Sequence, residues 1–331
     1  MPLQSSASPH RIDIVVYPGF KAMEAVGPMT VFDYANHQLA RRGRPPAYEI
    51  RIVSSEAGPV RSDTLMVLEA TGRLDTVLLP DTAVIVGARH IERAMDEAPA
   101  IVPWVRAVAP RIPRLVALCS GAFFLAAAGV LDGRRATTHW SVAALMRQRY
   151  PQVSVEPDAI FVQQGSLWTS AGVTAGIDLA LALVEADLGR DIALDLAREL
   201  VVFLKRPGGQ SQFSMHLASQ ATGHDGIRCA QDWILSEVAR DFTMAELADR
   251  AAMSERNFRR VFARETGMSP SAFIEATRLE AARRLLEQGE LPLKAVAARS
   301  GFGSDEALRR AFMRHLGITP RDYRQRFGAA A

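Results

Sequence analysis

The sequence predicts an α/β domain, in which a largely parallel sheet is flanked by helices, followed by an all-α domain with two helix-turn-helix units. Three observations predict this organisation. Short β-rich runs alternate with helical patterns over the first 200 residues, strand signals disappear beyond a turn-rich stretch near residue 205, and the helical remainder contains an internal repeat. Strands that alternate with helix-length connections favour a parallel sheet covered on both faces. A chain of 331 residues suits two such domains.

The hydrophobic pattern predicts the elements of the first domain in order. We expect strands at residues 11–17, 48–53, 76–79, 83–86 and 115–118, and a hairpin made of residues 160–163 and 167–170. Helices are expected at residues 22–38, 101–108, 176–188 and 192–204. The expected domain boundaries are a disordered N-terminus at 1–10, a first domain at 11–205, a linker at 206–226 and a helical domain at 227–327.

Composition excludes several classes of protein. Hydrophobic residues make up 48% and charged residues 23%, which is typical of globular chains and too apolar for a disordered one. The uncharged stretch 115–131 is shorter than the roughly 20 residues of a membrane span, and the N-terminus lacks a signal-peptide pattern. Two distant cysteines and seven histidines without metal-ligand spacing indicate no disulfide framework, no metal and no cofactor. We therefore expect a cytoplasmic protein without a membrane partner.

An internal repeat is the most informative feature of the helical domain. Residues 258–270 read FRRVFARETGMSP and residues 308–320 read LRRAFMRHLGITP, so that four arginine-or-phenylalanine positions, a glycine and a proline recur 50 residues later. Upstream, residues 244–251 match residues 293–300 at an offset of 49. The difference of one residue falls in the turn, where an insertion is tolerated.

Each copy of the repeat predicts two helices joined by a short turn. Ser254 and Ser304 are expected to cap the second helix of each copy, and Thr243 and Glu246 match a capping box. Apolar side chains share one face of these second helices, and arginines, which bind both guanine edges and phosphates, lie on the other. A helical hairpin with a solvated basic face is the alternative for one copy; two copies in register favour DNA binding. The expected DNA-binding residues are Ser254, Arg256, Asn257, Arg259, Arg260, Arg264, Ser304, Asp305, Arg309, Arg310 and Arg314.

The helical domain resembles the DNA-binding domain of AraC/XylS-type transcription regulators. The resemblance is carried by Gly301-Phe302, by residues 308–312, by Gly-Ile-Thr-Pro at 317–320 and by Tyr323-Arg324. It implies two helix-turn-helix units joined by a long helix at about 271–288, which sets both recognition helices on one face of DNA. The chain departs from the family at residues 307–308, where two aromatic residues are usual.

Cys119 lies between a predicted strand and an apolar helix, with Gly121 two residues later. This is the outline of a nucleophile elbow, and a helix N-terminus is expected to stabilise the thiolate. Together with His139 and Glu24, the segment resembles the ThiJ/PfpI, or class I glutamine-amidotransferase-like, superfamily. The resemblance implies a flavodoxin-like sheet with these three side chains close together. Fused to an AraC-type domain, the whole chain resembles the GlxA-family regulators, although those usually have Asp where Glu24 stands.

Three interpretations of Cys119 remain open. Cys119 attacks a carbonyl or isonitrile carbon, as in a hydratase or amidase tethered to DNA, with His139 or Glu24 moving protons; or the site binds a small effector; or the cysteine is simply buried in a core. The presence of a DNA-binding domain favours the interpretation that the site binds an effector. We therefore expect that the protein is not an enzyme and that Cys119, His139 and Glu24 are vestigial catalytic residues. The expected effector pocket comprises Glu24, Cys119, Ser120, His139 and Trp140.

The expected function is that of a sequence-specific transcription regulator controlled by an amine or amino-acid-like effector held through ring faces. The resemblance implies such effectors, because related regulators respond to arginine, carnitine or betaine-type compounds. We expect a homodimer that binds double-stranded DNA and the effector. RNA polymerase is a further candidate partner. Charge agrees: residues 1–222 contain 21 basic and 21 acidic residues, and residues 223–331 contain 18 and 15, so the whole excess of +3 lies in the helical domain.

Overall fold

The computed structural model describes residues 8–204, 224–289 and 291–327. The chain divides into two compact units, Met1–Arg206 and Pro207–Ala331, and among the described residues strands occur only in the first unit. The expected linker lies largely within 205–223 and most of the expected disordered N-terminus within 1–7, outside the described residues; β1 begins at His10.

A seven-stranded sheet forms the centre of the first unit, in the order β10-β11-β7-β6-β1-β2-β5. β1 (His10–Val15) pairs in parallel with β2 (Tyr48–Ser54) and β6 (Thr82–Ile85), and β6 pairs in parallel with β7 (Arg114–Leu118). β11 (Leu167–Ser170) continues the parallel set beside β7, whereas β10 (Phe161–Gln164) forms the predicted antiparallel hairpin with it. All four residues of β6 and of β11 are buried, as expected for strands covered on both faces.

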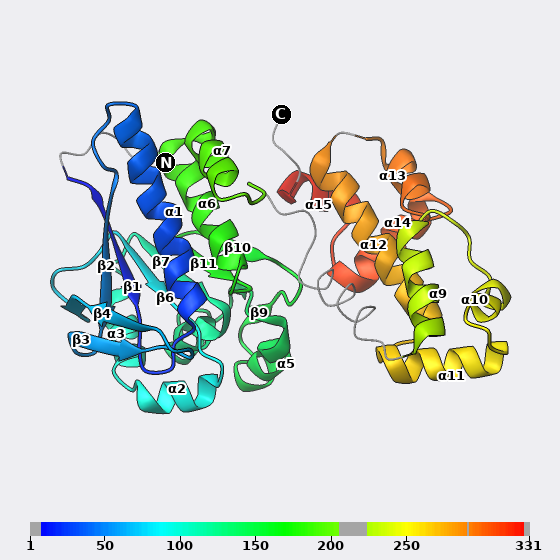
Figure 1. Ribbon diagram of the computed structural model, residues 1–331, viewed down its shortest axis with the longest axis horizontal. Helices are drawn as coiled ribbons and strands as arrows, with labels where there is room; N and C mark the ends of the chain where they lie inside the picture. Colours follow the sequence, from blue (N-terminus) through cyan, green and yellow to red (C-terminus); the bar gives the residue numbers. More distant parts are fainter. Residues whose placement is uncertain (1–7, 205–223, 290, 328–331) are drawn as a thin grey trace. The chain divides into compact units, whose positions relative to one another are not determined.

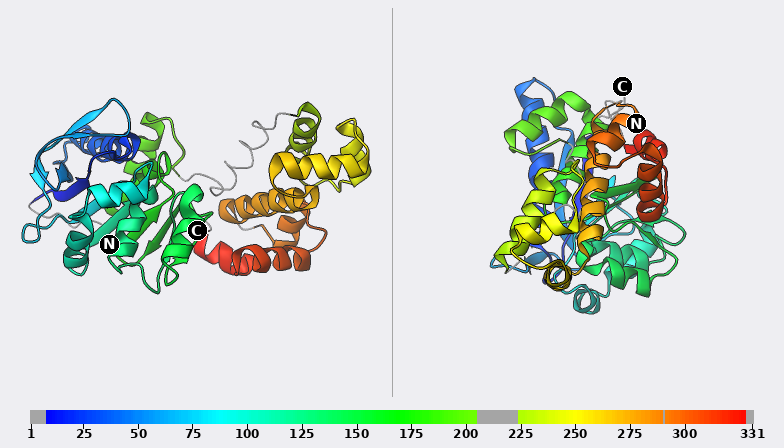
Figure 2. Two further views of the ribbon diagram at one scale, coloured as in Figure 1. Left: turned by 90° about the horizontal axis from the view of Figure 1, so that it is seen from below. Right: turned by 90° about the vertical axis from the view of Figure 1, so that its right-hand side faces the viewer.

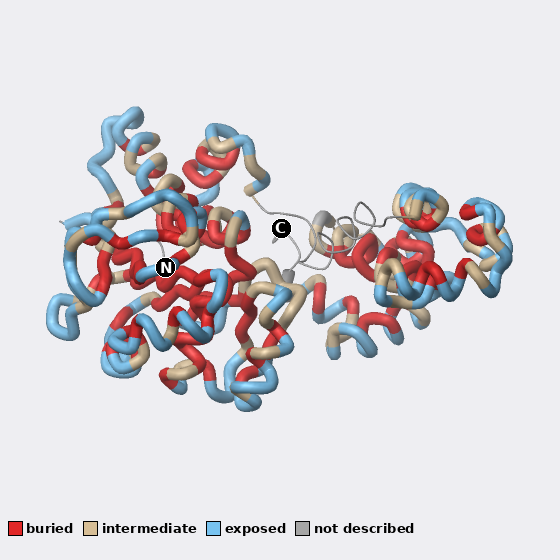
Figure 3. The backbone as a smooth tube through the Cα atoms, turned by 60° about the horizontal axis from the view of Figure 1, so that its bottom comes forward, coloured by how far each residue is buried: buried red, intermediate tan, exposed pale blue. Residues whose placement is uncertain are grey.

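Helices cover this sheet in two layers, which can be followed in Figures 1 and 2. α1 (Ala22–Arg41), α6 (Ala175–Leu188) and α7 (Arg190–Glu199) pack against one another, and α3 (Ile101–Val108) packs against α4 (Ala122–Ala127). Figure 3 shows that buried residues gather in the interior of the unit and that exposed residues lie on its outer turns. The predicted α/β fold with a mostly parallel sheet is confirmed.

Short elements that the hydrophobic pattern did not indicate complete the unit. They are β3 (Gly58–Arg61), β4 (Val67–Ala70), β5 (Gly72–Arg73), α2 (Ile91–Glu97), the 3-10 turn η1 (Cys119–Gly121), β8 (Arg135–Ala136), α5 (Trp140–Arg149) and β9 (Ser154–Val155). β3 and β4 form an antiparallel hairpin, and β8 pairs with β9. These five strands have two to four residues each, too few for an alternating pattern to be recognised.

The predicted strand at residues 76–79 is wrong. This segment is a bend, and the side chains of Val77 and Leu78 are exposed. The carboxylate of Asp75 accepts the backbone N–H of Val77 at 2.6 Å and of Leu78 at 3.2 Å. These local hydrogen bonds lower the pKa of Asp75 and give the backbone an alternative to strand pairing, which an aspartate favours just before a turn.

The helix predicted at residues 192–204 also ends earlier than expected. α7 ends at Glu199, and Val201 follows with φ of 56°. A β-branched residue in the left-handed region is incompatible with a continuing right-handed helix. Val201 and Phe203 are exposed, whereas Val202 and Leu204 are partly buried against the core, so the apolar residues beyond Leu200 alternate in burial without forming a helix.

The second unit consists of helices, as predicted. They are α9 (Asp225–Ser236), α10 (Met244–Arg250), α11 (Glu255–Thr266), α12 (Pro270–Gln288), α13 (Leu293–Arg299), α14 (Asp305–Leu316) and α15 (Pro320–Phe327). The predicted capping box of Thr243 and Glu246 begins α10. Ser254, Ser269 and Ser304 cap α11, α12 and α14, and Pro270 stands in the first turn of α12.

Two separate cores stabilise the halves of this unit. Phe258, Phe262 and Phe273 lie in the first, with α9 and α10, and Leu308 and Phe312 lie in the second, with α13 and α15. The long helix α12 contributes to both cores, its first part to one and its second part to the other. In the described ranges no helix is both long and apolar enough to cross a membrane.

Candidate effector site and DNA-binding surface

Four segments of the first unit meet where neighbouring parallel strands end. Lys21 and Glu24 follow β1, Gly87 follows β6, Cys119 follows β7, and Val173 follows β11. These strands are adjacent in the sheet, and their carboxyl ends lie at the same edge. Open parallel sheets place their ligand sites at this edge.

Cys119 occupies a strained turn between β7 and η1. Its φ is 54°, a left-handed conformation that is rare for a residue with a side chain. Gly172 lies against it: a Cβ at residue 172 would stand 2.0 Å from the Cβ of Cys119, and its own φ is +84°. Gly121 is equally constrained, since a Cβ there would stand 2.5 Å from the carbonyl oxygen of Ile85. The turn therefore needs glycine at two positions, at residue 121 within the turn and at residue 172 in the segment that packs against it.

Glu24 is fully buried beside the thiol. Its Oε2 accepts the backbone N–H of Gly87 at 2.7 Å, and its Oε1 accepts that of Val173 at 3.3 Å. Burial raises the pKa of Glu24, while Lys21 and the two N–H donors act in the opposite direction. The carboxyl group also interacts with the thiol of Cys119, so it connects all four segments.

Lys21 completes this cluster and is a candidate site residue that sequence reasoning missed. Its ammonium donates a hydrogen bond to the Sγ of Cys119 at 3.1 Å and lies 3.7 Å from the Oε1 of Glu24. Burial works to lower the pKa of Lys21, but Cys119 and Glu24 together raise it above its ordinary value. A signal was present in the sequence, because Lys21 precedes Glu24 by three residues at the start of the helix that follows the first strand.

The expected stabilisation of a thiolate is wrong. Burial and the neighbouring Glu24 raise the pKa of Cys119 to about 12, and the nearby ammonium of Lys21 only partly opposes them. Cys119 has no exposed surface. The thiol is therefore neutral near pH 7, unlike the accessible low-pKa cysteines that act as nucleophiles.

The other predicted pocket residues differ in burial: Ser120 lies in the interior, whereas His139 and Trp140 lie at the start of α5. The Oγ of Ser120, which is buried, donates to the carbonyl of Ala88 at 2.8 Å and accepts its N–H at 2.9 Å. His139 caps α5: its Nδ1 accepts the N–H of Ser141 at 3.3 Å and pairs with the Oγ of the same serine at 2.7 Å. Burial and the charge of Lys21 lower the pKa of His139.

Trp140 begins α5 at the surface, with an exposed fraction of 57%. Its ring lies 5.5 Å from that of His139, centroid to centroid. The structure thus brings Glu24, Cys119 and Ser120 together in the interior, and places the aromatic pair at the surface.

The predicted DNA-binding residues lie on α11 and α14. Ser254 accepts the N–H of Asn257 at 3.4 Å and Ser304 accepts that of Ala307 at 3.1 Å, so that both predicted caps begin these helices. The opposite, apolar faces are buried in the two cores. The exposed members of the predicted set are Ser254, Arg256, Arg259, Arg260, Arg264, Ser304, Asp305, Arg309, Arg310 and Arg314, and Asn257 is half-buried.

Several of these arginines pair with acidic side chains within the unit. Glu306 lies 3.2 Å from Arg309 and 3.8 Å from Arg310, measured between carboxylate oxygen and guanidinium nitrogen. Arg309, followed by Arg310, lowers the pKa of Glu306. Exposed pairs of this kind contribute little to stability and exchange readily for other partners.

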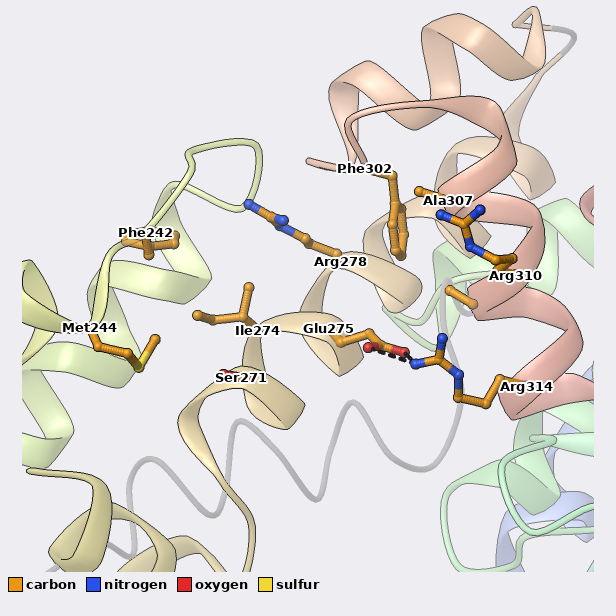
Figure 4. Close-up of a pocket in the computed structure, with 11 residues that line it drawn as sticks. Phe242, Met244, Ser271, Ile274, Glu275, Arg278, Phe302, Ala307, Arg310 and Arg314 are labelled. Atoms are coloured by element: carbon orange, nitrogen blue, oxygen red, sulfur yellow. Dashed lines mark hydrogen bonds and ion pairs between the residues drawn. The ribbon is translucent and has the colours of Figure 1, made fainter. Parts of the chain in front are cut away.

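A groove of about 340 Å³ separates the two halves of the helical unit. Figure 4 shows Ile274, Glu275 and Arg278 of α12 on its floor, between Phe242 and Met244 on one side and α14 on the other. The remaining lining residues are Ser271, Phe302, Ala307, Arg310, Ala311 and Arg314.

Glu275 is the acidic residue of this groove and contacts two side chains of α14, Arg314 and His315. Its carboxylate accepts hydrogen bonds from Arg314 at 3.0 and 3.2 Å and lies 2.7 Å from the Nε2 of His315. The pair with Arg314 is drawn in Figure 4. The bridge joins the first part of α12 to the last turn of α14.

Comparison with known families divides the chain in the same way. The model of the DJ-1/PfpI family matches residues 10–186, and that of a helix-turn-helix domain matches residues 247–326. Among curated relatives, the HTH-type transcriptional regulator CdhR of Pseudomonas aeruginosa is 31% identical over 313 residues, which are 92% of this chain and 89% of CdhR.

Two further relatives match little more than half of the chain. The isonitrile hydratase of Pseudomonas putida is 28% identical over 185 residues, 55% of this chain and 74% of that enzyme. The crystal structure of an AraC family transcriptional regulator from Pseudomonas putida superposes with a TM-score of 0.52 at 26% identity, covering 58% of this chain and all of that one.

Proposed function

We propose that a small effector bound in the α/β domain controls the binding of this protein to specific DNA sites, because the chain belongs to the DJ-1/PfpI family and is a transcriptional regulator in which that domain is fused to a helix-turn-helix DNA-binding domain. The family matches confirm the resemblance to GlxA-family regulators. The effector belongs to the amine or amino-acid-like class and binds around Lys21, His139 and Trp140, above the buried Glu24, Cys119 and Ser120.

The observation that carries the DNA-binding part of this proposal is that the helical unit presents two equivalent helices with exposed arginines. α11 and α14 have the same cap, the same buried face and exposed arginines at equivalent positions, as Arg259 and Arg309 illustrate. Two such helices joined by the 19-residue α12 suit two segments of a major groove. In this proposal residues 227–327 form the DNA-binding domain, residues 11–205 the sensor and 206–226 the connection.

The state of Cys119 supports a sensor rather than an enzyme. A neutral thiol with no exposed surface lacks the two properties of a nucleophilic cysteine, which are thiolate character and access to a substrate. The runner-up is a cysteine-dependent hydratase or amidase that is tethered to DNA. It is favoured by the strained conformation of Cys119 and by the similarity to an isonitrile hydratase.

We further propose that the protein acts in the cytoplasm as a homodimer on double-stranded DNA. Duplicated half-sites related by two-fold symmetry are the usual targets of dimeric helix-turn-helix proteins. RNA polymerase would be the partner of a regulator that activates transcription.

Selection of genomic fragments by the purified protein, followed by footprinting, tests the regulator directly. We expect protected sites of defined sequence, and Cys119→Ala should bind them as wild type does while responding differently to an effector. Uniform protection at every sequence would contradict site-specific regulation. If Cys119→Ala abolishes a turnover of isonitriles or amides by the wild-type chain, the enzyme reading replaces the regulator as the primary function.

A further inference from the structure

The two halves of the helical unit are built on one helix but do not share a core. On α12 the first core ends at Ile274 and the second begins at Leu279, and among the described residues no apolar side chain belongs to both cores. The groove described above lies between the halves. Hydrophobic packing therefore organises each half by itself, and the contacts at this junction decide how one half is held against the other.

Arg278 occupies the junction. Its side chain extends from α12 towards the segment 238–241, which joins α9 to α10 in the first half (Figure 4). Its Nη2 donates to the carbonyl oxygen of Arg240 at 2.6 Å and lies 3.1 Å from the Oδ1 of Asp241. Its Nε donates to the carbonyl oxygen of Val238 at 3.4 Å. The guanidinium group thus binds the backbone of this segment at two points.

The turn of the second half lies against the same segment. A Cβ at Gly301, between α13 and α14, would stand 2.3 Å from the carbonyl oxygen of Val238 and 3.1 Å from the Cα of Ala239. The same Cβ would stand 2.7 Å from the Nε of Arg278. Arg278 is therefore close both to a connecting segment of the first half and to the turn of the second.

The other link across the groove is of a different kind. Glu275 pairs with Arg314, whose side chain is 61% exposed, and exposed ion pairs exchange their partners readily. The side chain of Arg278 is only 17% exposed, and its acceptors include two backbone carbonyls. A planar guanidinium that binds fixed acceptors has little freedom to move. Of these two links, Arg278 is the more rigid.

On the basis of the proposed function, we propose that Arg278 is a positioning residue for DNA binding. By holding the segment 238–241 beside Gly301 it fixes the separation of α11 and α14, and with it the number of base pairs between the two subsites that these helices contact. One extra base pair moves a subsite by about 3.4 Å and turns it by about 35°. A rigid unit accepts one spacing, whereas a loosened one accepts several and binds each less tightly, because the effective concentration of the second helix at its subsite falls.

The test measures binding of the full-length protein to DNA by fluorescence anisotropy at one salt concentration. Three duplexes are compared: a footprinted site, the same site with one base pair inserted between the two subsites of one protomer, and the site with one of these subsites scrambled. Arg278→Met removes the hydrogen bonds at similar side-chain length, and Arg278→Lys retains the charge with a single nitrogen. Arg284→Met is the matched control, since it removes an arginine from the same helix six residues away, outside the junction.

We expect the insertion to weaken binding by the wild type about thirtyfold or more, and binding by Arg278→Met roughly threefold or less. Arg278→Met should bind the footprinted site about tenfold more weakly than the wild type does, but the scrambled site to within roughly twofold. Arg278→Lys should have an intermediate insertion penalty, and Arg284→Met that of the wild type.

Three results would overturn the inference and leave the proposed function in place: an undiminished insertion penalty in Arg278→Met, an equal loss on all three duplexes, which indicates general damage to the fold, or a wild type that binds its site specifically and tolerates the insertion. Far-UV circular dichroism checks that Arg278→Met is folded; if it is not, Arg278→Lys decides, and a wild-type penalty in that variant overturns the inference. If the wild type distinguishes none of the duplexes, site-specific regulation fails and the inference with it.

Discussion

The turn of each helix-turn-helix unit contains one residue with positive φ, and the repeat makes the two turns a matched pair. Ala252 has φ of 54° in the first turn, and Gly301, 49 positions later, has φ of 80° in the second. Exchanging these residue types should therefore have opposite effects. Ala252→Gly is expected to stabilise the first half of the unit, and Gly301→Ala is expected to destabilise the second.

The magnitudes follow from the surroundings of each residue. A left-handed conformation costs a residue with a Cβ about 1–2 kcal/mol, while glycine adds unfolded-state entropy worth about 0.4–1 kcal/mol. Ala252→Gly should thus stabilise by about 0.5–1 kcal/mol. A Cβ at Gly301 would also stand 2.3 Å from the carbonyl oxygen of Val238 and 2.7 Å from the Nε of Arg278. Because Val238 contributes backbone, Gly301→Ala should cost about 2–4 kcal/mol.

Hydrogen exchange of the full-length chain, resolved by peptide, measures both effects in one protein. We expect exchange in α10 and α11 to slow by roughly two- to fivefold in Ala252→Gly, and exchange in α13 and α14 to quicken by about thirtyfold or more in Gly301→Ala. Gly303→Ala is the control, since nothing lies within 4 Å of its Cβ position. Faster exchange in Ala252→Gly, or a Gly301→Ala protein indistinguishable from the control, would refute the reasoning.

Three further predictions concern charge. Arg309→Ala should lose about 1–3 kcal/mol at a footprinted site and relax its sequence preference if the side chain reads a base; equal losses on all sequences would instead indicate a phosphate contact. Glu275→Gln should release Arg314 and His315 and strengthen binding to random duplex DNA several-fold, with a salt slope steeper by about 1; unchanged binding across salt titrations would place this bridge away from DNA. Removal of the ammonium in Lys21→Met should raise the pKa of His139, since its charge is one of the causes of the lowered value; ring titration by NMR decides this, and a pKa equal to that of wild type counts against the proximity of the two groups.

The helical unit was the most predictable part of the chain. The repeat contains the same helix-turn-helix pattern twice, so that each copy supports the prediction from the other. The caps at Ser254, Ser269 and Ser304 occur where a serine precedes a helical pattern. Local hydrogen-bonding rules and periodicity decide such boundaries, so no knowledge of distant contacts is needed.

The first unit was less predictable wherever distant contacts decide the outcome. The apolar residues Val77 and Leu78 suggested a strand, but the carboxylate of Asp75 turns the backbone and leaves both exposed. At the candidate site, Cys119 was identified from its place between a strand and a helix, and Glu24 from the resemblance to the ThiJ/PfpI superfamily. Their protonation depends on complete burial and on Lys21, neither of which the linear spacing reports.

The strand order has a consequence for the time at which the thiol becomes protected during folding. Cys119 is covered by segments that are far apart in the chain, from Lys21 to Gly172, so its enclosure requires the central strands to be assembled. Such long-range closures come late and reopen only in large fluctuations. The other cysteine, Cys229, is exposed. With Cys229 replaced, the rate at which a thiol reagent labels Cys119 measures how often the whole α/β sheet opens, without any probe having to be introduced.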